Sequence, residues 1–239
     1  MEKHEKKRLA SSERVALIAS GVVVAFVAIL FGAFWRGKPG TSATLKPAPT
    51  VVQGFTLEDQ KGHMFNLAAD RGKVIVLAFL YTHCTDECPF IAEKFKLAYA
   101  GLTAAERREV DFVVVSADPV GDTLKTAAAY SNEFGMYDAW HYLIGTRKEL
   151  SPIWSYYERM LPSGDATGAH GSEFHPEVGL NTISLDAAQS AISKFGGGPD
   201  IDHPTTVWLF DRQHQLNTTL SFEVFPSDLI ADIRTLIHD

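Results

Sequence analysis

The sequence predicts an α/β domain with a central, partly parallel sheet, preceded by one membrane-spanning helix. Two segments, Val74–Tyr81 and Asp111–Ser116, have the composition of buried strands, and a stretch with helical spacing follows each. Buried strands that alternate with helices are typical of α/β folds. The spanning helix is predicted because Val15–Trp35 contains neither a charge nor a proline.

The N-terminal region has the pattern of a signal anchor. A polar, basic leader covers residues 1–14, and at about 1.5 Å per residue Val15–Trp35 would span roughly 31 Å, the thickness of a bilayer core. More basic residues precede this segment than follow it, which predicts a cytoplasmic N-terminus and an exported C-terminal part. A cleavable signal peptide is the alternative, although Gly32–Trp35 is a poor cleavage site. We expect an uncleaved, single-pass anchor in a bacterial cytoplasmic membrane, with the domain on the outer (periplasmic) face.

The remainder of the chain is predicted to be a linker and one acidic domain. Residues 36–50 are rich in Gly, Pro, Ser, Thr and Ala, as linkers are, and the exported domain covers residues 51–239. Of the 22 basic and 29 acidic residues, five and three lie in the first 35, which leaves a net charge of −9 for the rest. This charge excludes the basic surface of a nucleic-acid-binding protein and favours a cationic partner or a metal ion.

The elements of the domain follow from local patterns. A hairpin turns at Asp59–Gly62, and after the first buried strand a helix begins at Cys88 or Pro89. Its apolar face would contain Ile91, Phe95, Ala98 and Leu102. The second buried strand leads into a loop where we expect Asp122 to cap the next helix and Gly135 to end it.

The second half is predicted to continue as strand, helix, hairpin and helix. A capping box at Thr146–Glu149 would open a helix, although Pro152 favours a later start at Ser151–Pro152. Residues 162–201 are Gly-, Ser- and Asp-rich. The other predicted elements are a strand at Trp140–Ile144, a short helix near Asp186–Phe195, strands at Thr205–Phe210 and Leu216–Phe222, and a last helix from Pro226.

The only two cysteines, Cys84 and Cys88, lie where the first buried strand meets its helix. Amide N–H groups and the helix dipole favour a thiolate there, and two close thiolates can bind a soft metal or form a disulfide. An inert structural disulfide is the alternative. Right-handed crossovers would place this loop and the Asp118–Asp122 loop on the same carboxyl edge, where α/β proteins have their sites.

Three motifs give the chain a resemblance to a known family. The segments FLYTHCTDECP (Phe79–Pro89), VVVSADPVGDT (Val113–Thr123) and IDHPTTVWLFD (Ile201–Asp211), together with a single anchor, resemble the SCO/SenC family over about residues 51–237. The resemblance implies a thioredoxin-like domain with a central mixed sheet flanked by helices. It also implies a role in handling copper during cytochrome c oxidase assembly.

The resemblance places the metal ligands on Cys84, Cys88 and His203, which would hold one copper ion as Cu(I) or Cu(II). The implied function is a metallochaperone that delivers copper to the dinuclear copper site of an oxidase subunit. Implied partners are that subunit, other copper chaperones and thioredoxin-like reductants. An alternative is a thiol–disulfide oxidoreductase with Cys84 and Cys88 as its redox pair, acting on oxidase cysteines or other exported proteins. A third possibility is an assembly factor with structural cysteines, so enzymatic activity stays open.

The chain also departs from the family pattern. Pro204 follows the histidine, Arg212–His214 occupies a bend that usually contains glycine, and the 162–201 segment is longer than usual. Thioredoxin-like enzymes have a cis-proline opposite their cysteines, so we consider a cis His203–Pro204 bond.

Several other residues are candidates for a role at the site. We expect His83 to be an exposed loop residue, with metal binding as the alternative, and Asp118 to be a turn residue. His170 and His175 could form a second metal site in the insertion. We expect three aromatic residues to lie in the core: Trp154, Tyr157 and Trp208.

Overall fold

The computed structural model describes residues 52–69, 71–161, 185–198 and 200–239, all within one compact unit, Lys46–Asp239. No helix in these ranges is long and apolar enough to cross a membrane. The predicted anchor, Val15–Trp35, lies outside the described residues, as do the leader, the linker and most of the 162–201 insertion.

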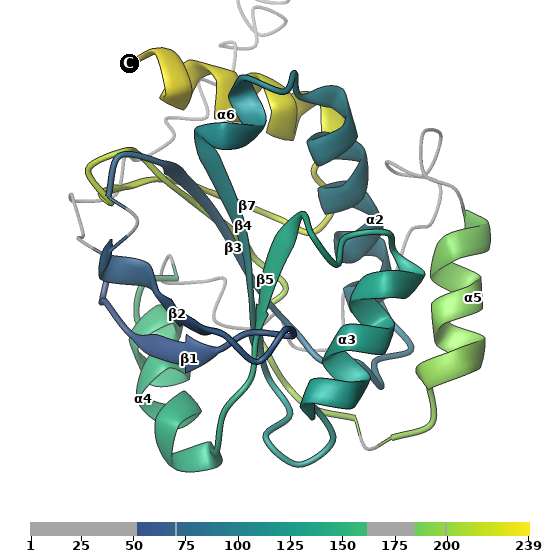
Figure 1. The fold of residues 1–239 in the computed structure, drawn as a ribbon. Coiled ribbons are helices and arrows are strands. Elements are labelled where there is room, and N and C mark those ends of the chain that lie inside the picture. Colours follow the sequence, from purple (N-terminus) through teal and green to yellow (C-terminus); the bar gives the residue numbers. More distant parts are fainter. Residues whose placement is uncertain (1–51, 70, 162–184, 199) are drawn as a thin grey trace, which may run out of the picture. The chain divides into compact units, whose positions relative to one another are not determined.

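A five-stranded sheet forms the centre of the unit, in the order β5–β4–β3–β6–β7 (Figure 1). β3 pairs in parallel with β4, and β4 with β5, whereas β6 is antiparallel to both β3 and β7. The predicted mixed sheet is therefore confirmed. The strands are β3 (Val74–Leu80), β4 (Val110–Ser116), β5 (Trp140–Leu143), β6 (Val207–Phe210) and β7 (Leu216–Leu220).

The central strand β3 is buried on both faces. Val74, Val76, Ala78 and Leu80 enter one hydrophobic cluster, and the residues between them enter another. All seven side chains are buried, as the uninterrupted apolar run predicts. At about 2 kcal/mol for each large apolar side chain buried, this strand contributes strongly to stability.

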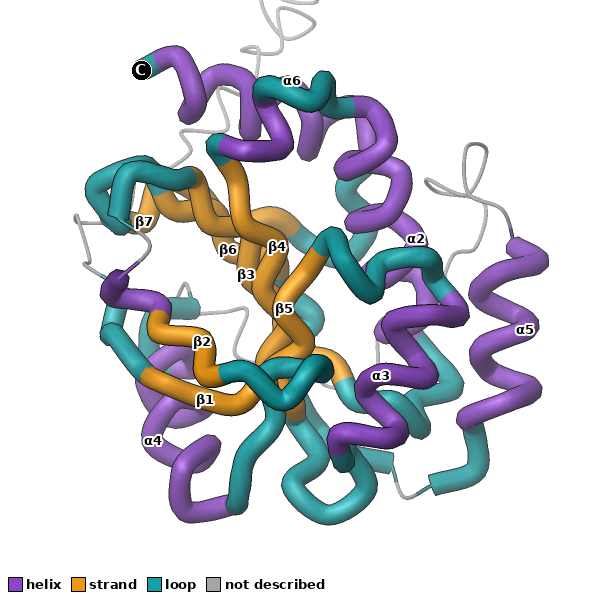
Figure 2. The backbone as a smooth tube through the Cα atoms, in the orientation of Figure 1, coloured by secondary structure: helices purple, strands orange, loops and turns teal. Residues whose placement is uncertain are grey.

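Helices cover the two faces of the sheet unequally. Figures 1 and 2 show α4 (Arg147–Glu158) beside the hairpin of β1 (Thr56–Glu58) and β2 (Met64–Asn66), away from α2, α3 and α5. Residues of α4 enter the cluster that contains Ile75. The helices that enter the cluster containing Val74 are α2 (Glu87–Gly101), α3 (Leu124–Glu133), α5 (Leu185–Phe195) and α6 (Pro226–His238). Two short 3₁₀ turns complete the described elements, η1 (Leu67–Ala69) and η2 (Glu106–Arg108).

Most predicted elements occur within one or two residues of their expected bounds. The α2 helix begins at Glu87, one residue before the earlier predicted start, and its predicted apolar face is buried. The capping box opens α4 at Thr146, so the later start at Pro152 is wrong. Pro152 is accommodated inside α4, where it lacks the N–H that would bond to the preceding turn.

The topology brings two distant segments to one end of β3. Since β3 and β4 are parallel, the loops after Leu80 and Ser116 leave the sheet on the same side, and Ala117 N donates to Leu80 O at 2.9 Å. Since β6 is antiparallel to β3, its first residue, Val207, pairs with Ala78 near that same end. The chain that enters β6 therefore approaches the cysteine loop.

Candidate metal centre

Both cysteines lie in the connection between β3 and α2. Cys84 N donates to Tyr81 O at 3.3 Å, which turns the chain back immediately after the strand. Cys88 is in the first turn of α2 and is fully buried, and Cys84 is 3% exposed. Both are free thiols. The short loop after β3 and the first turn of α2 thus place two buried sulfurs at the carboxyl edge of the sheet, as the sequence predicts.

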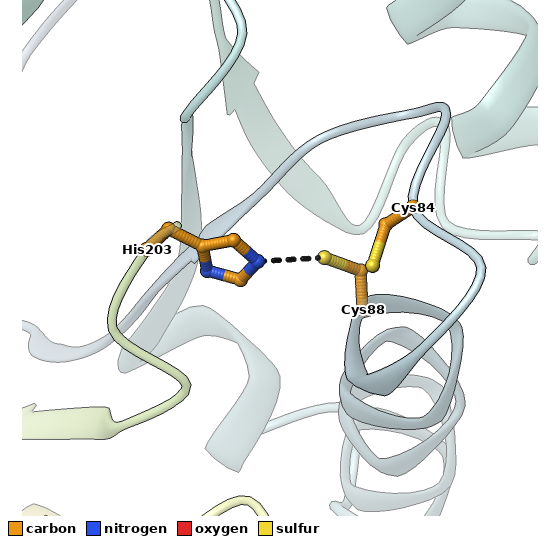
Figure 3. A group of neighbouring side chains, drawn as sticks. All are labelled: Cys84, Cys88 and His203. Atoms are coloured by element: carbon orange, nitrogen blue, oxygen red, sulfur yellow. Dashed lines mark hydrogen bonds between the residues drawn. The ribbon is translucent and has the colours of Figure 1, made fainter. Parts of the chain in front are cut away.

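His203 completes the cluster from the segment that precedes β6. Its Nε2 lies 3.3 Å from Cys88 Sγ, and the ligand atoms of His203, Cys84 and Cys88 all lie within 4.8 Å of one another (Figure 3). In the part of the chain that the structure describes, these three residues form the only group of metal-ligating side chains at such distances. The three predicted ligands therefore meet although 115 positions separate Cys88 from His203.

The orientation of the imidazole suits metal binding through Nε2. His203 Nδ1 lies 3.1 Å from Pro204 O, and since a carbonyl oxygen only accepts, Nδ1 carries the proton. This tautomer leaves the Nε2 lone pair directed at the sulfurs. The His203–Pro204 bond is trans, so the proposed cis-proline is wrong. The trans form is the general preference of X–Pro bonds, and it already allows His203 to reach Cys88.

The two thiols have opposite electrostatic environments. A hydrogen bond from Cys88 is the largest influence on Cys84, and it lowers the pKa of the Cys84 thiol. Burial raises the pKa of Cys88 well above its ordinary value. The metal-free centre therefore pairs one thiolate with one thiol at neutral pH.

This asymmetry predicts the ultraviolet thiolate absorbance of the reduced, metal-free protein. Since the pKa of Cys84 is lowered, its thiolate persists below neutral pH, and the absorbance falls only as the pH drops through that lowered pKa. We expect about one thiolate per chain near pH 7. Cys84→Ser should remove this fall in absorbance below neutral pH. In Cys88→Ser the Cys84 thiolate should remain, with a pKa nearer to that of a free cysteine. An unchanged fall in Cys84→Ser would contradict the assignment.

Tyr81 holds the His203 segment against the cysteine loop. Its hydroxyl donates to Asp200 Oδ1 and accepts from Ile201 N, both at 3.3 Å. Its ring contacts the imidazole of His203 edge-on, with centroids 5.3 Å apart. From the sequence, Tyr81 is predicted only to end a strand, because no local pattern shows which distant segment a buried hydroxyl contacts.

Asp122 links the cysteine loop to two strands, β4 and β5. Its Oδ1 accepts from Thr82 N and Thr82 Oγ1 at 3.0 and 2.8 Å, and its Oδ2 accepts from Ser116 Oγ and Tyr142 OH at 2.6 and 3.0 Å. The prediction that Asp122 caps the next helix is wrong, because Thr123 is the N-cap of α3. Thr123 is exposed and free to bond Thr126 N, whereas Asp122 points inward. Its carboxylate therefore fixes Thr82, two residues before Cys84.

The remaining candidates lie near the cluster or outside the described residues. Asp118 forms the predicted turn, since its Oδ1 accepts from Val120 N and Gly121 N. His83 is half-buried, so the prediction of an exposed residue is wrong: its Nδ1 lies 3.2 Å from Thr82 Oγ1. It is outside the three-ligand group. His170 and His175 lie outside the described residues.

Two of the three aromatic predictions are confirmed. Tyr157 and Trp208 are fully buried. Trp154 is half-buried: it packs against a core cluster and also lines a cavity, so its assignment to the core is only partly correct. Helical spacing identified the inward face of α4, but Trp154 lies at the border of that face, where its indole reaches Ser116 O.

Comparison with known proteins identifies relatives of this chain. A family model described as SCO1/SenC matches residues 43–175. A putative copper-binding protein of Stutzerimonas stutzeri is 30% identical over 89 residues, which is 36% of this chain and 44% of that protein. This chain spans less than half the length of the curated relatives that it matches.

Solved structures share the fold. Bradyrhizobium japonicum ScoI with copper bound has a TM-score of 0.57 at 20% identity, over 78% of this chain and 99% of that one. BsSco, described as having a disulfide switch and as a member of the Sco family of cytochrome c oxidase assembly proteins, has a TM-score of 0.55. Its identity is 18%, over 80% of this chain and 95% of that one. These similarities confirm the thioredoxin-like α/β fold.

Proposed function

This chain belongs to the SCO1/SenC family, and from that premise we propose that it is a copper metallochaperone. In this proposal Cys84, Cys88 and His203 hold one copper ion and deliver it to the dinuclear copper site of a cytochrome c oxidase subunit. The observation that carries the proposal is the convergence of two sulfurs and one imidazole nitrogen within 4.8 Å.

The donor set suits copper. Thiolates are soft ligands that select Cu(I), and imidazole binds both oxidation states of copper. Zinc is bound by the same donors, and catalytic zinc sites also have three protein ligands, so the choice of copper rests on the relatives as well as on the donors. A site with three ligands leaves a position that a ligand of the accepting protein can occupy during transfer.

The relatives support the cargo and the acceptor. One of them is named for copper binding, and a solved neighbour has copper bound. Another neighbour is described as belonging to a family of cytochrome c oxidase assembly proteins. The apolar segment Val15–Trp35 would anchor the chain in the cytoplasmic membrane and hold the domain on its outer face, where an oxidase subunit can be reached.

We expect His203→Ala to weaken Cu(I) binding without changing its stoichiometry of one ion per chain. The two sulfurs remain and the third donor is lost, so the dissociation constant should rise roughly tenfold to a hundredfold, or about 1.4 to 2.8 kcal/mol. The measurement is an anaerobic competition titration of the detergent-solubilised chain against a chromophoric Cu(I) chelator.

The matched control is His63→Ala, because His63 is an exposed histidine in the β1–β2 turn and outside the three-ligand group. Its Cu(I) affinity should equal that of the wild type. Equal affinities for His203→Ala and the wild type would remove His203 from the site.

Thiol–disulfide exchange is the second candidate function. It is favoured by the lowered pKa of Cys84 beside a second free thiol, because an attacking sulfur must be a thiolate. An insulin-reduction assay separates the two functions. Rapid turnover by a chain that retains no copper would favour the oxidoreductase, and tight copper binding without turnover would favour the metallochaperone.

A further inference from the structure

A cavity of about 250 Å³ adjoins the candidate metal centre, and His203 forms part of its wall. It lies between one face of α4 and the two segments Ala117–Pro119 and Ile201–Pro204. On α4, positions 147, 154 and 158 follow helical spacing and line the cavity together. A group bound in this cavity would therefore lie beside His203.

The apolar wall of the cavity is fixed in place. The indole N–H of Trp154 donates to Ser116 O at 3.0 Å, which holds the ring of this half-buried residue at the end of β4. Phe79 is 1% exposed and belongs to the core of the sheet. An indole face that is held by a hydrogen bond is a preformed surface for a cationic group.

The charged groups of the cavity are mostly negative. Three carboxylates, those of Asp118, Glu158 and Asp202, line it together with one cation, Arg147. No ion pair of Arg147 with any of them is present among the described residues. The lining thus has a formal excess of negative charge, which attracts cations.

Asp118 supplies a buried carboxylate with a spare acceptor. It is 4% exposed, and its Oδ1 accepts from Val120 N and Gly121 N. Within the described ranges no hydrogen bond reaches its Oδ2, which lies beside Gly121. The negative charge of a buried carboxylate that lines a cavity attracts a cation more than that of an exposed one, because water screens it less.

We propose that this cavity receives a lysine or arginine side chain of the protein that accepts the metal. The proposal rests on the proposed function and adds the chemistry by which the acceptor is recognised. A cavity of this size holds one long side chain, whose stem contacts Trp154 and Phe79 and whose charged end meets the carboxylates. Because His203 shares the wall, the acceptor residues next to that side chain are brought to the metal centre.

The test uses the metal-free, detergent-solubilised full chain with ¹⁵N-labelled tryptophan. The chain contains four tryptophans, so the indole N–H signals are few. N-acetyl-arginine amide is titrated in, and N-acetyl-citrulline amide is the neutral control of the same shape. We expect a saturable shift of the Trp154 signal with the arginine probe alone, and no shift of buried Trp208. Equal shifts with both probes, or none, would overturn the proposal.

Two charge variants must change probe affinity in opposite directions. Glu158→Gln removes an attractive charge and should weaken binding about fivefold, whereas Arg147→Gln removes a repulsive one and should strengthen it about threefold. Lys148→Gln, next to Arg147 but outside the cavity, and Asp228→Asn on α6 are the matched controls and should have no effect. Inverted signs would mean that the cavity binds anions and would overturn the proposal.

The Cu(I) affinity of the same variants separates this proposal from the proposed function. Glu158 and Arg147 are exposed and outside the three-ligand group, so both variants should bind Cu(I) as the wild type does. A wild type that binds Cu(I) but not the arginine probe would overturn the cavity proposal alone. A wild type that binds the arginine probe but not Cu(I) would overturn the proposed function alone.

Discussion

Replacing Asp122 by alanine should lower the free energy of unfolding by about 3 kcal/mol, since buried polar groups left without partners cost about 1–3 kcal/mol each. The carboxylate accepts four hydrogen bonds, from Thr82, Ser116 and Tyr142. The hydroxyl groups can rotate towards other acceptors or towards water in the new cavity, but the Thr82 N–H cannot. Urea denaturation of the metal-free protein measures the change.

The control for this prediction is Asp122→Asn. The asparagine oxygen can still accept from Thr82, and its amide can donate to the rotatable hydroxyls of Ser116 and Tyr142, so the loss should be clearly smaller. If Asp122→Ala is as stable as the wild type, the carboxylate does not hold β4, β5 and the cysteine loop together.

Replacing Cys88 by serine should weaken Cu(I) binding by roughly a thousandfold or more, because a hydroxyl is a hard donor and Cu(I) prefers soft sulfur. This effect exceeds the one expected for His203→Ala because a thiolate also neutralises the charge of the ion. Cys84→Ser should produce a loss of similar size, since each variant leaves one sulfur and one imidazole. The chelator competition titration measures both.

Folding must be checked in the cysteine variants, because Cys88 is fully buried in the first turn of α2. Serine is close to cysteine in size, so circular dichroism and the urea midpoint should show a folded domain. A folded Cys88→Ser chain that binds Cu(I) as tightly as the wild type would contradict the proposed ligand set.

The fold was largely predictable because its main signals are local. The apolar runs of β3 and β4, the spacing of α2 and the capping box of α4 each depend on neighbours in sequence. The antiparallel placement of β6 beside β3 is not a local property, and it was not predicted beyond a mixed sheet. The resemblance to a family placed His203 at the cysteines.

The residues that were assigned wrongly or only in part are those whose partners lie far away in sequence. Asp122 fits the pattern of a helix cap, but its partners Thr82 and Tyr142 are 40 and 20 positions distant. Trp154 has the spacing of a core residue, yet its partner is Ser116 O, 38 positions earlier. Whether such a side chain bonds to a local or to a distant partner depends on the assembled sheet. The sequence of one segment therefore does not predict it.

The bend after β6 shows how a departure from a family pattern can be accommodated. The chain has no glycine there, and His214 adopts a positive φ of 61°. Its N–H donates to Asp211 O, and Asp211 Oδ1 accepts from Gln213 N and Gln215 N, which holds the turn. A left-handed residue other than glycine costs roughly 1 kcal/mol, which these hydrogen bonds offset.

X-ray absorption spectroscopy of the Cu(I)-loaded chain tests most directly whether Cys84, Cys88 and His203 hold the metal together. The structure predicts two sulfur ligands and one imidazole nitrogen for each copper ion, with the imidazole contribution lost in His203→Ala. A spectrum with sulfur ligands alone in the wild type, or one that His203→Ala leaves unchanged, would contradict the three-ligand centre.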